Sequence, residues 1–79
     1  MEILFEKAAA KHIATLDRDT KQRIRSAIEK IPDGDIKKLK GYKNEFRLRV
    51  GDMRVLFSML SDSIIIRDVL PRGSAYKRL

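Results

Sequence analysis

The stretch that decides the fold is EFRLRVGDMRVLFSML, residues 45–60. Its first six residues, Glu45–Val50, alternate charged with apolar side chains, as in a strand that is covered on one side only. Gly51-Asp52 is a two-residue turn of the kind that closes a hairpin, and Met53–Leu60 is rich enough in Val, Phe and Leu to return as the second strand. The hairpin therefore places Arg47 and Arg49 together on its charged face.

A third strand follows the hairpin. Ser61-Asp62-Ser63 forms the next turn, and Ile64–Leu70 is rich in β-branched residues, as expected for a strand buried on both faces and central in its sheet. Pro71 ends this strand. The remaining tail, Arg72–Leu79, is too short for more than about one turn of helix.

The residues before the hairpin predict a strand and two helices. Met1–Phe5 is a short apolar run that starts the domain as a strand, and an apolar stripe follows on a helix spanning Lys7–Leu16. Asp19 is the expected N-cap of a second helix, because Gln22 stands three residues later as in a capping box. Pro32-Asp33-Gly34 ends that helix. Asp17 and Asp19 are interpreted as caps and not as an acid/base pair.

These elements predict an α+β fold in the order β-α-α-β-β-β. The chain has 79 residues and 9.1 kDa, which is enough for one small domain over 1–79 and for no second core. The helix hairpin is expected to pack on a mainly antiparallel four-stranded sheet.

Composition excludes several classes of function. Cysteine is absent, which excludes disulfides, a thiolate nucleophile and cysteine-ligated metals, and favours a reducing cytoplasm. A single histidine, His12, and the lack of a carboxylate cluster with ligand spacing predict no metal, and no glycine-rich phosphate loop is present, so no cofactor is expected. His12 is interpreted as a surface or packing residue. No apolar run approaches the ~20 residues of a bilayer span, and no membrane partner is expected.

The positive charge lies in the second half of the chain. Residues 1–36 carry seven basic and seven acidic side chains, whereas residues 37–54 have a net charge of +5 and residues 67–79 one of +3, within a total of +7. Such segregation favours an anionic partner, most often a phosphate backbone. The alternative is a basic surface that serves solubility.

Four arginines and one tyrosine carry the candidate chemistry. Arg47 and Arg49 share a strand face, Arg54 is expected to lie near Arg49 across the hairpin, and Arg72 and Tyr76 follow the last strand. A guanidinium binds phosphate through two parallel hydrogen bonds and suits a developing phosphorane charge. Neighbouring arginines would lower the pKa of Tyr76 toward a useful range, although the phenol would also serve to stack on a base. The residues alone leave open whether this is a binding surface or a catalytic site.

Three segments resemble the RelE/ParE superfamily of bacterial and archaeal toxins: Lys38-Leu39-Lys40-Gly41, the hairpin from Phe46 to Phe57, and Val69–Tyr76 with its Arg-Gly-Ser-Ala-Tyr end. The order β-α-α-β-β-β is also that of the superfamily. RelE-type members are ribosome-dependent mRNA endonucleases that cut within the A-site codon, by attack of the RNA 2′-hydroxyl and without a metal. ParE-type members share the fold and inhibit DNA gyrase. A noncatalytic RNA-binding module is the third alternative.

The resemblance implies roles for individual residues. Arg54 stands where the superfamily's hairpin arginine contacts the scissile phosphate, and Tyr76 resembles the tyrosine that stacks on the nucleotide and takes part in proton transfer. Glu45 stands where the best-known RelE-type pattern has a lysine. The expected catalytic residues are Arg47, Arg54, Arg72 and Tyr76, and the expected RNA-binding residues are Lys37, Lys38, Lys40, Lys43, Arg49, Lys77 and Arg78. The resemblance also implies the ribosome and mRNA as partners, and a cognate acidic, RelB-like antitoxin.

Overall fold

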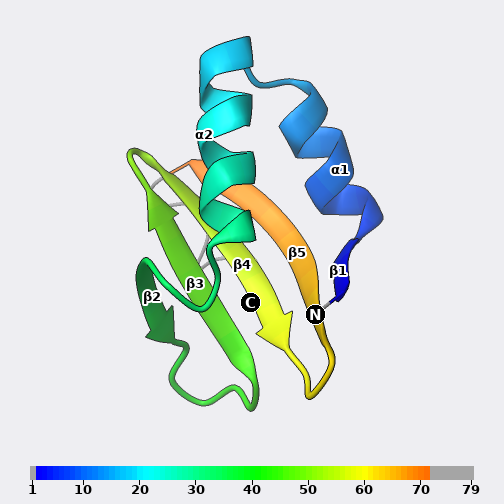
Figure 1. The fold of residues 1–79 in the computed structure, drawn as a ribbon, viewed down its shortest axis with the longest axis vertical. Helices are drawn as coiled ribbons and strands as arrows, with labels where there is room; N and C mark the ends of the chain where they lie inside the picture. Colours follow the sequence, from blue (N-terminus) through cyan, green and yellow to red (C-terminus); the bar gives the residue numbers. More distant parts are fainter. Residues whose placement is uncertain (1, 72–79) are drawn as a thin grey trace.

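A computed structural model describes residues 2–71 as two helices on one side of a five-stranded sheet (Figure 1). The strand order is β1-β5-β4-β3-β2; β1 is parallel to β5, and the other neighbours are antiparallel. In chain order, the elements are β1 (Glu2–Phe5), α1 (Lys7–Ala14), α2 (Arg18–Glu29), β2 (Asp35–Lys38), β3 (Glu45–Val50), β4 (Met53–Met59) and β5 (Ser63–Pro71).

The predicted α+β fold and element order are confirmed, but the sheet has five strands and not four. The additional strand, β2, is an edge strand of four residues that pairs antiparallel with β3. Its sequence, Asp-Ile-Lys-Lys, contains one apolar residue, so no alternation marks it. Ile36 lies opposite Leu48 and packs against the core, and this tertiary contact defines the strand.

Both helices begin or end two residues away from the prediction. α1 ends at Ala14, and the hydroxyl of Thr15 donates to the carbonyl oxygen of His12 at 2.7 Å. α2 begins at Arg18, and its N-cap is Asp17, whose carboxylate accepts from the backbone N–H of Thr20 at 3.0 Å and from its hydroxyl at 2.6 Å. The assignment of Asp19 as N-cap is wrong, because it lies inside the first turn, whereas Asp17 has the extended backbone of a cap.

The core lies between the helices and the sheet. β4, in the middle of the sheet, contributes Val55 and Phe57, and β5 contributes Ile64 and Ile66, all at most 2% exposed. From the helices, the buried residues are Ala9, Ile24 and Ile28. β5 is flanked by strands on both sides, as predicted for Ile64–Leu70, but Arg67 in its middle is exposed.

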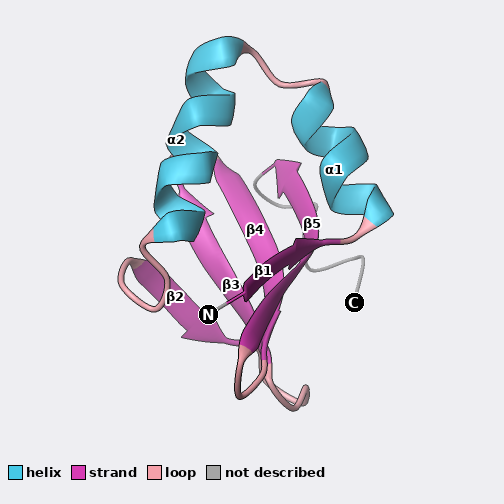
Figure 2. Ribbon diagram, turned by 45° about the vertical axis from the view of Figure 1, so that its right-hand side comes forward, coloured by secondary structure: helices cyan, strands magenta, loops and turns pink. Residues whose placement is uncertain are grey.

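The two helices diverge over the sheet (Figure 2). α1 packs on β5, whereas α2 lies over β3. A polar contact holds α1 in place: His12 Nδ1 lies 2.5 Å from Oδ1 of Asp68, a buried carboxylate that also accepts the N–H of Val69 at 2.9 Å. Neither helix among residues 2–71 is long and apolar enough to cross a membrane.

The N-cap of α2 generates a first prediction. Asp17→Ala should lower the melting temperature at neutral pH more than Asp19→Ala, although both remove one negative charge from the same helix end. Only Asp17 binds Thr20, and the hydrogen bonds from Thr20 lower the pKa of Asp17 below its ordinary value of 3.8. Its stabilisation is therefore fully present above pH 3.8 and is lost as the pH falls through the lower folded-state value.

Thermal unfolding followed by circular dichroism from pH 7 to strongly acidic conditions measures this effect. The difference between the two variants should shrink at the acidic end. Equal losses for both variants at neutral pH would contradict the capping role of Asp17.

Candidate functional site

Four basic side chains meet on the face of the sheet that points away from the helices, called here the open face. Arg49 of β3 lies directly opposite Arg54 of β4, and Arg47 lies directly opposite Lys37 of β2. Residues that face each other across antiparallel strands project to the same side, so Lys37, Arg47, Arg49 and Arg54 form one basic cluster. The expected proximity of Arg49 and Arg54 is confirmed by this register.

Arg47 is largely enclosed, with a side chain that is 11% exposed. Its Nη1 donates to the backbone carbonyl of Asp35 at 3.2 Å and lies 3.4 Å from the Asp35 carboxylate. Its Nε is buried and finds no acceptor among residues 2–71. A guanidinium has five N–H donors, and Asp35 accepts from Nη1 of Arg47 alone.

A small buried apolar cluster borders the basic cluster on the same face. Leu56 lies opposite Arg47 and Leu70 lies opposite Arg54, and together with Leu39 these side chains form a small buried cluster apart from the main core. Apolar neighbours lower the local dielectric constant, which strengthens the attraction between a guanidinium and a phosphate. The open face thus combines charge with a buried apolar cluster.

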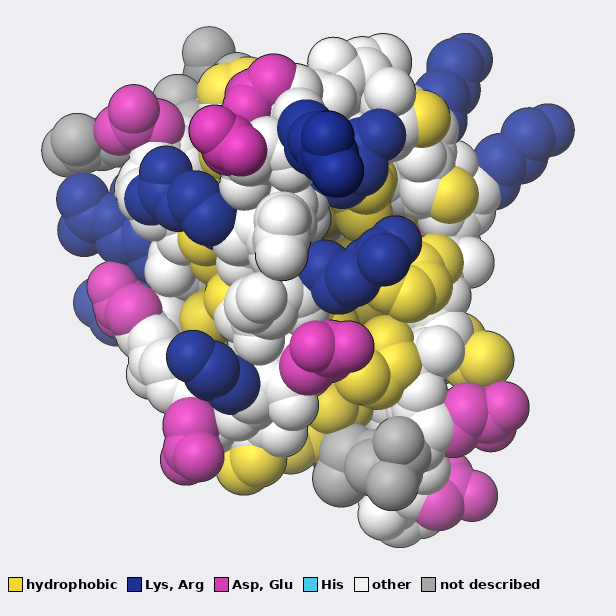
Figure 3. Space-filling model, turned by 45° about the horizontal axis from the view of Figure 1, so that its top comes forward, with side chains coloured by type: hydrophobic (Ala, Val, Ile, Leu, Met, Phe, Trp, Pro, Cys, Tyr) yellow, Lys and Arg dark blue, Asp and Glu magenta, His cyan; other side chains and the backbone are white. Residues whose placement is uncertain are grey.

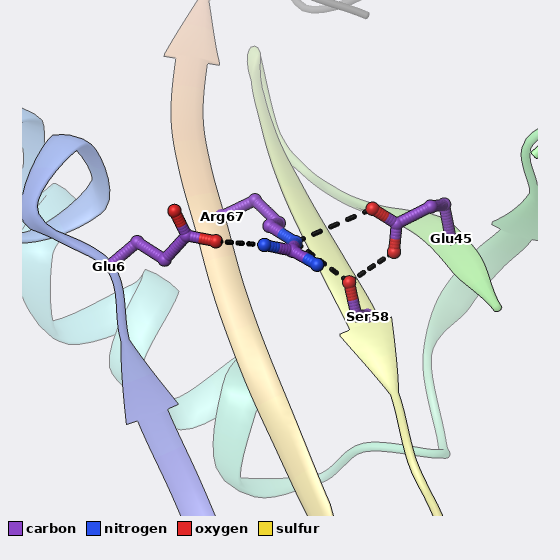
Figure 4. A network of polar contacts seen from close by, with 4 residues as sticks. All are labelled: Glu6, Glu45, Ser58 and Arg67. Atoms are coloured by element: carbon purple, nitrogen blue, oxygen red, sulfur yellow. Dashed lines mark hydrogen bonds and ion pairs between the residues drawn. The ribbon is translucent and has the colours of Figure 1, made fainter.

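A second group of polar side chains crosses the open face (Figure 4). Arg67 Nε on β5 donates to the hydroxyl of Ser58 on β4 at 2.8 Å and lies 3.4 Å from the carboxylate of Glu45 on β3. The Ser58 hydroxyl donates to the same carboxylate, and Nη1 of Arg67 binds Glu6, the residue after β1. We call these four residues the Arg67 network.

The Arg67 network limits the effect of Glu45 on the basic cluster. Glu45 stands two residues from Arg47 on the same face, and an uncompensated carboxylate there would repel an anion. The Glu45 carboxylate instead binds Ser58 of β4 and Arg67 of β5, and Arg67 compensates its charge. The sequence pattern did not predict this network; the available signal was the Arg67-Asp68 pair inside the otherwise apolar run Ile64–Leu70.

The other predicted residues fall in three places. Lys38 lies opposite Phe46, which packs against the main core, so its side chain belongs to the helix side and not to the basic cluster. Lys40 and Lys43 are exposed in the segment between β2 and β3. Arg72, Tyr76, Lys77 and Arg78 lie outside the described residues. Within residues 2–71, no three His, Asp or Glu side chains gather in a way that would hold a metal ion.

Comparison with known proteins places this geometry in a family. No protein-family model matches the chain. It is 37% identical to toxin RelE3 of Methanocaldococcus jannaschii, in an alignment that covers 96% of each protein. The chain belongs to the RelE toxin family.

Solved structures of RelE toxins have the same fold. The RelE-family chain matches the RelB–RelE antitoxin–toxin complex of Methanococcus jannaschii with a TM-score of 0.80 and 35% identity, covering 96% of this chain and 98% of that one. It matches the archaeal RelE–RelB complex of Pyrococcus horikoshii with a TM-score of 0.74 and 28% identity, covering 91% and 94%. At 18% identity, the YoeB dimer of Staphylococcus aureus shares the fold alone, with a TM-score of 0.74 and coverage of 89% and 94%.

Ser58 gives a test of the Arg67 network in this RelE-family chain. It is 2% exposed and bonds both Arg67 and Glu45, so Ser58→Ala leaves two charged groups without a shared partner. The expected loss in the free energy of unfolding is about 1–3 kcal/mol, measured by urea denaturation. Ser61→Ala, in the exposed turn after β4, is the matched control and should change stability little. A Ser58→Ala protein as stable as this control would show that the network does not hold the sheet.

Proposed function

We propose that this protein is the toxin of a RelB–RelE type toxin–antitoxin system and that it cleaves mRNA in the ribosomal A site. The identity to toxin RelE3 supports the toxin assignment, and one geometric observation supports the chemistry. Arg49 and Arg54 lie directly opposite each other on the open face. Like charges in this arrangement destabilise a sheet, and a bound phosphate relieves the repulsion.

The basic cluster supplies what RNA cleavage requires. The 2′-hydroxyl of the RNA attacks the adjacent phosphorus, the bond from phosphorus to the 5′-oxygen breaks, and the products are a 2′,3′-cyclic phosphate and a free 5′-hydroxyl. The nucleophile belongs to the RNA, so the proposed reaction is metal-independent. Arg54 and Arg47 are proposed to stabilise the phosphorane, and Arg49, opposite Arg54, is proposed to bind the RNA phosphate.

Proton transfer is assigned to the tail. Tyr76 is proposed to stack on the nucleotide and to exchange a proton with the reacting oxygens, and Arg72 is proposed to hold the phenolate form. Lys37, Lys40 and Lys43 are proposed to contact the neighbouring phosphates, because Lys37 belongs to the basic cluster and the other two are exposed in the segment between β2 and β3. Lys77 and Arg78 are proposed to extend this contact.

A RelB-like antitoxin is the proposed protein partner. The solved RelE chains from Methanococcus jannaschii and Pyrococcus horikoshii are in complex with RelB, which supports this assignment. The total charge of +7 favours an acidic partner, since opposite potentials speed association and fix its register.

Substitutions at Arg54 test the proposed chemistry. Arg54→Ala should lower A-site cleavage by about 100-fold or more, because a well-placed donor to a developing charge contributes roughly 3 kcal/mol. Arg54→Lys should restore part of the loss, since it keeps the charge and loses the planar fork. Primer extension on programmed ribosomes measures the cleavage. Arg18→Ala, an exposed arginine at the start of α2, is the control and should cleave like the unmodified protein.

The same experiment separates the alternatives. Growth arrest with intact A-site codons and reduced gyrase supercoiling would establish a ParE-type inhibitor and rule out the proposed reaction. Salt-sensitive RNA binding with neither cleavage nor growth arrest would establish a noncatalytic RNA-binding module.

Tyr76→Phe tests the proton-transfer role. The phenyl ring still stacks on a base, so RNA binding should remain, but the rate of cleavage in single-turnover assays should fall by about 10²-fold. Its dependence on pH should also change, because the titrating phenol is lost. A variant as fast as the unmodified protein would remove Tyr76 from the chemistry and leave it a binding role.

A further inference from the structure

The strand β5 contains one more residue than the stretch of β4 with which it pairs. Phe57 lies opposite Ile66, but the preceding residue of β4, Leu56, lies opposite Asp68. No residue of β4 is left to lie opposite Arg67, so β5 has a β-bulge at this point. A bulge bends its strand and redirects the side chains that follow it.

The bulge determines which side chain lies beside Arg54. Past the bulge, Val69 lies opposite Val55 and Leu70 lies opposite Arg54. Val69 is 1% exposed in the main core, whereas Leu70 belongs to the small apolar cluster on the open face. Without the extra residue, Val69 would lie opposite Arg54 and Leu70 would turn toward the main core, because a shift by one residue exchanges the two faces. The position of Leu70 beside Arg54 therefore depends on the bulge.

Asp68 stabilises the bulge from within β5. Its side chain is 7% exposed, and Oδ1 accepts the backbone N–H of Val69 at 2.9 Å. A bulge disrupts the ladder of hydrogen bonds, and a buried N–H group beside it needs another acceptor. In the regular register, Asp68 would lie opposite Val55, which is fully buried, and its carboxylate would enter the main core at a large desolvation cost. Asp68 therefore favours the bulged register over the regular one.

His12 binds the same carboxylate oxygen from α1. The pairing of β1 with β5 ends at Ile66, and α1, which follows β1 in the chain, packs on β5 (Figure 1). Nδ1 of His12 lies 2.5 Å from Oδ1 of Asp68. One oxygen atom thus joins the backbone of the bulge to a helix. We call His12, Asp68 and the N–H of Val69 the bulge clamp.

We propose that the bulge clamp positions Arg54 for RNA cleavage by holding Leu70 in its register. This inference rests on the proposed function and assigns His12 and Asp68 a positioning role in it, without contact between either side chain and the RNA. Leu70 lies directly opposite Arg54 and limits the directions in which its guanidinium points. A small displacement of a group that stabilises developing charge slows the reaction strongly, so a shift of Leu70 would misplace Arg54.

A contact that only adds stability would have different consequences. Loss of stability lowers the folded fraction of the protein, and the molecules that remain folded bind and cleave as before. Loss of positioning slows the chemical step of the folded protein, whereas binding through the exposed lysines stays unchanged. The saturated rate and the half-saturating substrate concentration therefore distinguish the two roles.

Substitutions at Asp68 test the positioning role. Asp68→Ala removes the acceptor of both hydrogen bonds and should lower the saturated rate of A-site cleavage by about 10–100-fold. The ribosome concentration at half saturation should change by less than about 3-fold. Asp68→Asn keeps an oxygen that accepts hydrogen bonds and should restore most of the rate. Single-turnover primer extension over a range of ribosome concentrations measures both quantities.

Substitutions at His12 test the clamp from its other end, where the side chain is 38% exposed and a change disturbs folding less. His12→Ala should slow cleavage less than Asp68→Ala does, because Val69 keeps its acceptor. His12→Asn places an amide N–H near the position of Nδ1 and should recover part of the loss. Lys11→Ala, on the exposed surface of the same helix, is the matched control and should cleave like the unmodified protein.

Asp17→Ala is the control for stability alone, because it removes the N-cap of α2 and leaves β5 unchanged. At a temperature where it stays folded, it should cleave at the unmodified rate. NMR of the labelled full chain without RNA reports the register directly. In Asp68→Ala, the amide of Val69 should exchange at least about 10-fold faster, and the cross-strand contacts between Arg54 and Leu70 should weaken.

The outcomes separate this proposal from the proposed function. Equal slowing by the clamp variants and Asp17→Ala at matched folded fractions would overturn the positioning role. Slowed cleavage with Leu70 still opposite Arg54 would also overturn it. In both cases the unmodified protein still cleaves, so the proposed function stands. Intact A-site codons with the unmodified protein would overturn the proposed function and the positioning role together.

Discussion

The pairing of β3 with β4 in one register is the constraint on which the rest of the structure depends. Leu48 lies opposite Val55 and Phe46 lies opposite Phe57, with the two aromatic rings stacked at 5.5 Å on the core side. Because side chains alternate, this register also brings Arg49 opposite Arg54 on the other side. A slip by one residue would bury the arginines and expose the core, so the packing of the core enforces the position of the basic cluster.

The sequence was most informative where a pattern repeats within one element. The alternation in residues 45–60 predicted the hairpin, the faces of its side chains and the meeting of Arg49 with Arg54. It was least informative where a partner distant in the sequence decides the structure. β2 becomes a strand because Ile36 packs opposite Leu48. The choice between Asp17 and Asp19 is local, and the extended backbone at Asp17 decides that it caps α2. The Arg67 network joins residues from position 6 to position 67, and no local pattern encodes such a contact.

The net charge of each sequence segment predicted the basic cluster on the open face, but it did not predict the charged residues on the helix side. Residues 37–54 carry a net charge of +5, and three of the four members of the basic cluster come from the two strands of the hairpin. The charges of residues 1–36 sum to zero, yet α2 places Lys21 and Arg25 one turn apart, where both line an apolar groove on the helix side (Figure 3). A sum over a segment hides this arrangement, because the helical period, and not the sum, determines which charges become neighbours.

An apolar groove lined by residues of β1, α1 and α2 lies on the helix side of the sheet, and the basic cluster lies on the open face, in a molecule whose smallest dimension is 23 Å. A single extended chain that reaches from one to the other must pass around the sheet edge, and at about 3.3 Å per residue this takes on the order of ten residues. Such a ligand would be bivalent. A segment held at the groove would keep the rest of the ligand at high effective concentration near the open face, so the open face could be uncovered and covered again without dissociation of the two chains. Occupancy of the protein by such a ligand and blockage of its charged surface would then be two separate equilibria.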